Sequence, residues 1–367
     1  MTRYEMIAKL LGIWTISITI VLQANPTGWY SNDEMATLYE AMTKISSESL
    51  YVDPQHSTPE EILKNYIYKI DAYGDYFTKK EYKAFQHTLS PEYAGIGMIL
   101  YQQKRNEKIL CIPTKKNLKE VGISRYDQLI SVDGRSVNGK NFYLVSSWIR
   151  GRKNSSVTLE LLKPSGKLQT ITLKRTEQYF QTIQRVIDNG TAMIQIIRFM
   201  KETPEELRSI LHQWPKNIPI LIDLRGNGGG DLFAAIQSAD LLLPKDTLIS
   251  SVETTKSCFD YRASNPDYMQ GQAVLLLQDE FTASAAEVFI AALTQNHRAE
   301  STGKKSFGKG VAQKFIPLSN GDALLLTYGK ITTPNGESYH KKGLLPTSDL
   351  SLSELLDNLD SNIKEMF

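Results

Sequence analysis

Cysteine is nearly absent from this chain, which contains only Cys111 and Cys258 among 367 residues. There is no CxxC pair and the five histidines are scattered, so we expect neither a zinc site nor a disulfide framework. A surplus of one charge is also missing, because 42 Lys+Arg face 40 Asp+Glu. That balance supplies no basic field for nucleic acid. The composition therefore favours a soluble, multidomain protein that needs no cofactor.

Long apolar runs are missing after the first 24 residues. Met1–Lys9 is basic and precedes the uncharged apolar run Leu10–Leu22. As a helix this run is about 20 Å long, shorter than the ~30 Å hydrocarbon core of a bilayer. With Ala24 after it, the pattern predicts an export signal in 1–24 and a location in the periplasm or cell envelope. The alternatives are an uncleaved membrane anchor at residues 10–22 and a buried N-terminal helix.

The remaining sequence has three patterns. Apolar residues recur at helix spacing between 33 and 88. From 94 to 176 the pattern changes to short strands separated by turn residues. Residues 190–348 alternate strands and helices, which predicts an α/β core. The core elements that we expect are strands at 193–197, 218–224, 274–277 and 311–316, and helices at 204–214, 233–243 and 285–294.

A glycine-rich loop, Asp223–Asp231, follows the predicted strand at 218–224. Four of the five residues from Gly226 to Gly230 are glycine. Such a loop can turn several backbone N–H groups toward one anion or oxyanion. Its place at the carboxyl end of a buried strand favours a functional role. A flexible strand–helix turn is the alternative.

Ser284 lies in a second loop, between a predicted strand and a predicted helix. A serine at a helix start has unpaired N–H groups and the positive end of the helix dipole beside it, which favour an alkoxide. Glu287, three residues later, also completes a capping box with Ser284, so a purely structural role is the alternative.

A serine nucleophile needs a base, and none of the five histidines lies in an informative motif, although a spatial Ser-His-Asp triad stays open. Lys309 follows Ser284 by 25 residues and has apolar neighbours. Burial could leave its amine neutral, whereas a solvated lysine is the alternative. Gly303-x4-Gly308-Lys309 also approaches a phosphate-binding loop, but Gly310 stands where a magnesium-binding Ser or Thr is needed.

Taken in order, these motifs resemble those of the C-terminal processing, or tail-specific, peptidases. Asp223–Gly230 resembles the family's DLRxNxGG, Thr282–Glu287 its SASASE and Phe307–Gln313 its FGKGxVQ. Further similar segments are Asp71–Tyr82, Gly95–Gly97, Val121–Gly134 and Ile149–Gly151.

The resemblance implies an α/β and α+β multidomain protein, in which a small β-rich, PDZ-like domain is inserted before an α/β protease core. The boundaries that we expect are an export signal or anchor at 1–24, a helical N-terminal region at 30–88, a PDZ domain at 89–177, a peptidase core at 178–350 and a C-terminal amphipathic helix at 351–367.

The family also implies roles for individual residues. Ser284 would attack a peptide carbonyl, and Lys309, held by Gln313, would accept its proton. The N–H groups of Ala285 and Gly229 would bind the oxyanion. These roles describe an exported serine endopeptidase with no metal or other cofactor.

A PDZ domain implies protein or peptide substrates with apolar C-termini, bound by strand addition. The residues that we expect to bind them are Gly95, Ile96, Gly97, Met98 and Leu118. The turn that is Lys-Pro-Gly-Asp in the family reads Ser124–Asp127 here, which bears on ligand preference. A catalytically inactive PDZ adaptor is the alternative function. Membrane association, a homo-oligomer, and occupation of the groove by the chain's own Met366-Phe367 end are further expectations.

Overall fold

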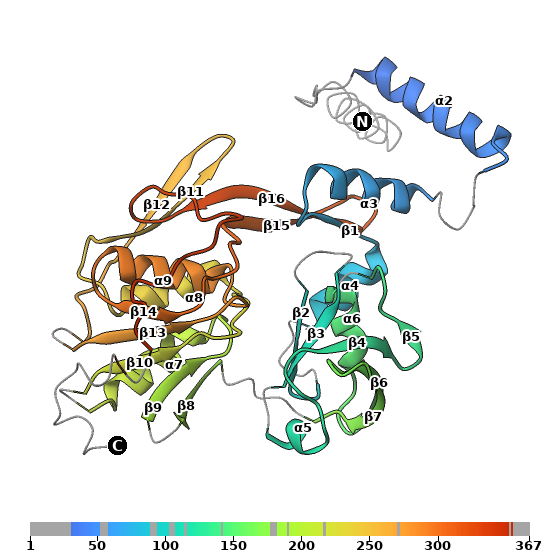
Figure 1. Cartoon of the computed structure of the whole chain (residues 1–367). Helices are drawn as coiled ribbons and strands as arrows, with labels where there is room; N and C mark the ends of the chain where they lie inside the picture. The colour runs from blue at the N-terminus through green and yellow to red at the C-terminus, as the bar shows by residue number, and fades with distance from the viewer. Residues whose placement is uncertain are drawn as a thin grey trace, which may run out of the picture. The chain divides into compact units, whose positions relative to one another are not determined.

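A computed structural model gives the fold of this chain (Figure 1). It describes residues 31–51, 58–88, 94–102, 107–113, 116–140, 142–176, 182–188, 191–215, 218–269, 272–351 and 354. The expected export signal and the apolar C-terminal end lie outside these residues. None of the helices within the described ranges is long and apolar enough to cross a membrane. The chain divides into two compact units between Leu63 and Lys64.

The first unit contains a helix, α2, that begins with a complete capping box. The Ser31 N–H donates to Glu34 Oε2 at 2.6 Å, and the Glu34 N–H donates to Ser31 Oγ at 3.2 Å. Its apolar stripe is exposed to solvent at Met35, Leu38 and Tyr39. A second helix, α3, begins in this unit and ends in the other. The bounds are α2 (Asn32–Glu48) and α3 (Pro59–Ile70).

In the larger unit, a mostly parallel sheet carries the predicted α/β core. Its strand order is β14-β13-β10-β9-β8, and β8 alone is antiparallel to its neighbour. Both β10 and β13 are fully buried, as apolar runs of this kind require. Because they are parallel, the loops that follow them leave the same edge of the sheet. The bounds are β8 (Ile183–Asp188), β9 (Thr191–Ile196), β10 (Ile220–Asp223), β13 (Val274–Gln278), β14 (Glu300–Gly303), α7 (Thr203–His212), α8 (Leu232–Asp240) and α9 (Ala285–Gln295).

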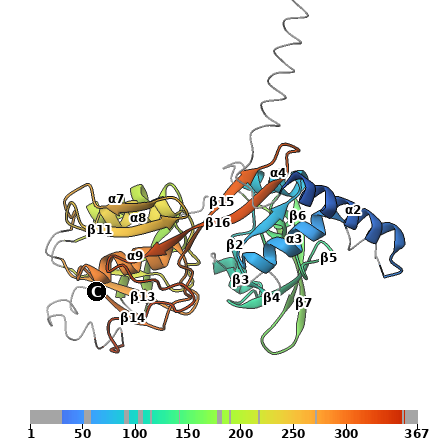
Figure 2. The same cartoon turned by 90° about the horizontal axis from the view of Figure 1, so that it is seen from above.

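A second, antiparallel sheet has the order β1-β16-β11-β12, with β15 paired to β16 (Figures 1 and 2). Its strand β1 corrects the sequence prediction, since it interrupts the region expected to be helical throughout. Three residues are too few to show a strand period, and all three of these are buried. The bounds are β1 (Asp75–Phe77), β11 (Leu248–Thr254), β12 (Cys258–Arg262), β15 (Val311–Pro317), β16 (Ala323–Thr332) and α4 (Lys79–Thr88).

Residues 94–176 form a six-stranded sheet with its own apolar core. The order is β2-β3-β4-β6-β7, with β5 on β4, so β2 lies at an edge. Burial alternates along β6, as it does in a strand with one face against a core. The sequence pattern did not predict helix α6 in this region. The bounds are β2 (Met98–Tyr101), β3 (Ile109–Pro113), β4 (Asp127–Val132), β5 (Arg135–Ser136), β6 (Ser156–Leu162), β7 (Leu168–Lys174), α5 (Lys116–Glu120) and α6 (Phe142–Ile149).

The two cysteines do not pair with each other. Cys111 is buried in β3 and Cys258 is exposed in β12, and both are free thiols. The coarse prediction of a mixed α/β fold is confirmed, and the six-stranded sheet precedes the parallel sheet along the chain.

Candidate active site

A cavity of about 420 Å³ brings together all five residues predicted for catalysis and oxyanion binding. Its walls come from the loops after β10 and β13, from the segment before β15, and from β2 of the six-stranded sheet. The predicted residues that line it are Ser284, Lys309, Gln313, Gly229 and Ala285.

Ser284 has an unusual backbone conformation at the start of α9. Its φ is +58° and its ψ is −120°, a region that residues other than glycine rarely adopt. Strain of this kind persists only where neighbouring contacts enforce it, and it concentrates at functional sites. Here the Thr282 hydroxyl donates to the Leu224 carbonyl at 2.9 Å and ties this loop to the end of β10.

Glu287 connects the serine to the lysine. Its side chain is 0% exposed, and its Oε2 accepts the N–H groups of both Ser284 and Lys309, each at 2.8 Å. Oε1 accepts from Ser306 Oγ and from the Gly308 N–H, each at 2.6 Å. Burial raises the pKa of Glu287, while these four hydrogen bonds oppose the rise. One carboxylate therefore holds both backbones, a role that the capping-box reading of the sequence missed.

Lys309 is held by its side chain as well. Its Nζ donates to Gln313 Oε1 at 2.7 Å, and Gln313 Nε2 in turn donates to the Tyr73 carbonyl at 2.6 Å. The Tyr73 ring lies under Nζ, 5.0 Å from it. Burial lowers the pKa of Lys309 to about 8; Asp71 opposes this shift and Arg198 adds to it. With that pKa, about a tenth of the molecules carry a neutral lysine at pH 7.

Two alternatives from the sequence were a phosphate-binding loop around Lys309 and a histidine as the base for Ser284. A phosphate-binding loop continues into a helix, but here the strand β15 follows Lys309. None of the described histidines lines the cavity. The His340 ring is edge-on to the Tyr73 ring, with centroids 5.8 Å apart. Tyr73 itself was not singled out, although it lies in a segment that resembles the family.

Gly229 lies directly against the serine. Its φ is +96°, and a Cβ there would come within 2.7 Å of Ser284 Cβ, so only glycine fits. The Gly229 N–H, however, donates to Asn227 Oδ1 at 2.9 Å. By contrast, the N–H groups of Ala285 and Gly230 have no hydrogen-bond partner among the described residues.

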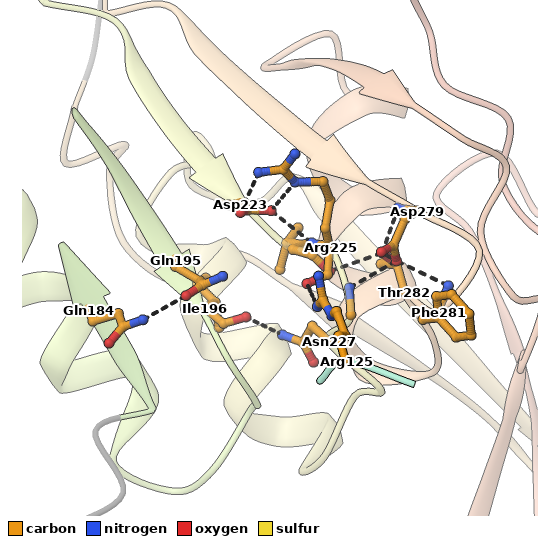
Figure 3. A network of polar contacts seen from close by, with 12 residues as sticks. Arg125, Gln184, Gln195, Ile196, Asp223, Arg225, Asn227, Asp279, Phe281 and Thr282 are labelled. Atoms are coloured by element: carbon orange, nitrogen blue, oxygen red, sulfur yellow. Dashed lines mark hydrogen bonds and ion pairs between the residues drawn. The ribbon is translucent and has the colours of Figure 1, made fainter. Parts of the chain in front are cut away.

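Polar side chains, of which Asp223 and Asn227 are buried, secure the glycine loop (Figure 3). Asn227 also donates from Nδ2 to the Ile196 carbonyl at 2.9 Å, which fixes the loop to β9. Asp223 and Arg225 form a bidentate ion pair, with both N–O distances at 2.9 Å. Asp279 Oδ1 accepts the Gly226 N–H at 2.9 Å. For Asp223, Arg225 and Asn227, the resemblance of Asp223–Gly230 to DLRxNxGG was the signal in the sequence that could have indicated these roles.

Two residues of the six-stranded domain reach these loops. Arg125 Nη2 donates to the Arg225 carbonyl at 2.8 Å. The Tyr126 ring stacks on Phe281, with centroids 4.2 Å apart. Both belong to the turn in which the sequence departs from the family pattern.

The residues predicted to bind a peptide C-terminus lie just before β2, at its first residue and in α5. Ile96, Met98 and Leu118 are buried in the core of the six-stranded domain. The Gly95 N–H donates to the Thr176 carbonyl at 3.1 Å. The next residues of β2 line the cavity, namely Ile99, Leu100 and Tyr101.

Known proteins resemble this chain over most of its length. Residues 190–350 match the profile of peptidase family S41. The carboxy-terminal processing protease CtpA of Bacillus subtilis is 30% identical over 325 residues, which are 87% of this chain and 69% of that protein. A probable CtpA-like serine protease of Staphylococcus saprophyticus is 31% identical over 320 residues, 86% of this chain and 65% of the relative. The chain thus spans about two thirds of these relatives' length.

The fold has a counterpart among solved structures. A photosystem II D1 C-terminal processing protease superposes with a TM-score of 0.67 at 20% identity, over 89% of this chain and 90% of that one. This likeness concerns the fold alone.

Proposed function

Because the chain belongs to peptidase family S41, the family of the carboxy-terminal processing proteases, we propose that it is an exported serine endopeptidase acting on protein tails. One observation carries the proposal: a single buried carboxylate oxygen holds the backbones of Ser284 and Lys309 at one cavity. The depressed pKa of Lys309 supports its role as the base.

In the proposed reaction, Ser284 Oγ attacks the carbonyl carbon of the substrate while the neutral Lys309 amine takes the hydroxyl proton. The tetrahedral intermediate collapses when the lysine gives that proton to the leaving amine, and an acyl-enzyme remains. Water, deprotonated by Lys309, then attacks the acyl carbon, and Lys309 returns the proton to Ser284 Oγ as the new C-terminus leaves. Gln313 keeps the amine in place throughout.

The oxyanion would lie at the start of α9. Ala285 can donate its unpaired N–H there, with the helix dipole behind it. Gly229 can contribute only if Asn227 shares or releases its N–H. The neighbouring Gly230 N–H is the alternative second donor, one residue along the same loop.

We assign substrate recognition to residues 94–176, as a PDZ-like domain. An unstructured tail would add as a strand at the β2 edge, whose residues line the cavity that contains Ser284. Apolar side chains of β2 and the nearby Phe307 favour an apolar tail. The reaction needs no metal or nucleotide.

The test compares the intact chain with Ser284→Ala on an unfolded protein that ends in an apolar or a charged tail. Cleavage, measured by gel and mass spectrometry, should occur with the intact chain and be lost in Ser284→Ala. The exposed Ser319 provides the control variant Ser319→Ala, which should cleave normally. Tail binding without cleavage by the intact chain would favour the inactive adaptor instead.

A further inference from the structure

Arg198 lies on the wall of the catalytic cavity, two residues after the end of β9. Its backbone is fixed, because the next residue, Phe199, receives the Asp231 N–H at 2.9 Å and donates its own N–H to the Gly229 carbonyl at 3.0 Å. The Arg198 side chain packs beside Gly230, where an added Cβ would come within 3.2 Å of Arg198 Cγ. A hydrogen-bonded backbone thus carries an exposed cation.

The Arg198 guanidinium has no hydrogen bond or ion pair within the described part of the chain. Two carboxylates also line the cavity, but each has another task. Asp231 Oδ1 caps α8 by accepting the Ala234 N–H at 2.8 Å. Asp75 is buried and accepts the Tyr76 N–H at 2.8 Å. The positive charge is therefore available to a ligand.

The charge also acts on groups across the cavity. It contributes to the low pKa of Lys309, and it opposes the rise that burial causes in the pKa of Tyr143. Lys309 must lose its own charge to act as a base, whereas an arginine stays protonated at every working pH. Arg198 is consequently the permanent cation of the cavity lining.

We propose that Arg198 binds a carboxylate of the substrate inside the catalytic cavity and so sets a preference beside the scissile bond. The proposal rests on the peptidase function proposed above. A guanidinium pairs with a carboxylate through two parallel N–H···O bonds, which neither an amide nor an ammonium reproduces. The carboxylate is either an acidic side chain near the cut or the terminal carboxylate of a short tail.

The experiment uses the full chain and a series of apolar-tailed peptides. The peptides differ at one position, which is scanned from three residues before the cut to three residues after it. At that position, one peptide of each pair carries Glu and the other carries its neutral isostere Gln. A second set of peptides compares a free C-terminus with an amidated one. The variants are Arg198→Gln, Arg198→Glu and the control Arg208→Gln. Arg208 lies on α7, pairs with Glu205 and is absent from the cavity lining, yet its substitution removes the same charge.

We expect kcat/KM to favour Glu over Gln at one position, or a free over an amidated terminus, by about 5-fold at low salt. Arg198→Gln should reduce that ratio to about 1, Arg198→Glu should invert it, and Arg208→Gln should leave it unchanged. A position-specific ratio identifies an acidic side chain, whereas an amidation effect identifies the terminal carboxylate.

Ratios that are equal in wild type and Arg198→Gln would overturn the proposal while leaving the peptidase function intact. If no peptide is cleaved at all, the peptidase function fails instead. Calorimetry of the same peptide pairs with Ser284→Ala and with the Ser284→Ala, Arg198→Gln double variant then still measures the carboxylate preference. Equal binding of the Glu and Gln peptides, and of the free and amidated ones, by Ser284→Ala would overturn the inference.

Discussion

Glu287 in the α/β core and Asp127 in the six-stranded domain are both carboxylates with 0% exposure, but their surroundings differ. Asp127 is neutralised by a cation, since Lys163 Nζ lies 2.5 Å from its Oδ2. Glu287 has no ion-pair partner among the described residues and accepts three backbone N–H groups and one hydroxyl. Asp127 is thus paired with a counter-charge and accepts one backbone N–H, that of Ser124 at 2.7 Å. Glu287 instead uses an uncompensated charge to fix two backbone segments, one at Ser284 and one at Gly308 and Lys309.

This difference indicates where function lies. Burying an ion without a counter-ion costs more than burying a pair, so it persists where it holds a geometry that the fold alone does not supply. Around Ser284, the buried polar groups Asp223, Asn227, Thr282 and Glu287 all fix loops. In the described part of 94–176 only Asp127 and Arg175 are buried polar groups.

The largest effect is expected at Lys309, whose backbone Glu287 holds. Lys309→Arg keeps a positive charge but cannot become a neutral base, so kcat should fall about 1000-fold, as far as in Lys309→Met. Thermal unfolding should show that both variants are folded. The control is Lys314→Arg on β15, the strand that follows Lys309. An active Lys309→Arg enzyme would show that the lysine supplies only charge.

Glu287→Gln should affect both activity and stability. The amide NH₂ would face N–H and hydroxyl donors that now bind a carboxylate oxygen, so we expect a loss of about 3 kcal/mol in unfolding free energy. Displacement of Ser284 and Lys309 should lower kcat by about 100-fold. Glu280→Gln, at an exposed acid that pairs with Lys304, is the matched control. If Glu287→Gln keeps the wild-type kcat, Glu287 does not position Ser284 and Lys309 for catalysis.

Asp127→Asn should change stability alone. The variant leaves the partly buried Lys163 without its counter-charge, which should cost about 1–2 kcal/mol in urea unfolding. Once folded, the protein should keep its kcat/KM. A large loss of kcat here would mean that the two carboxylates do not differ in function.

The smallest effect is expected from Tyr73. The wild-type rate should rise with pH through a value of about 8, as Lys309 loses its proton. The ring under Nζ favours the protonated amine, so Tyr73→Leu should move this rise by about 0.5 pH units to lower pH. Tyr73→Phe keeps the ring and should not move it. A pH–rate profile of each variant measures the shift.

The sequence predicted the parallel core well because apolar runs, glycine loops and capping residues are local signals. Ser284, Lys309 and Gln313 came from ordered motifs, and all three line one cavity. Local patterns could not show that Glu287 bonds to Lys309, 22 residues away, or that Asn227 occupies the Gly229 N–H. The strand β1 was missed because it exists only by pairing with β16, far along the chain.

The contacts of Arg125 and Tyr126 restrict how this protein can be recombined with its relatives. Tyr126, whose φ is +73°, stacks on Phe281, and Arg125 donates a hydrogen bond to the Arg225 carbonyl in the glycine-rich loop. Replacing residues 94–176 by the corresponding domain of a relative with a Lys-Pro-Gly-Asp turn would remove both contacts at once. Residues 94–176 and the loops around Ser284 are therefore not interchangeable modules, and a chimaera needs the turn at 124–127 carried over with the core.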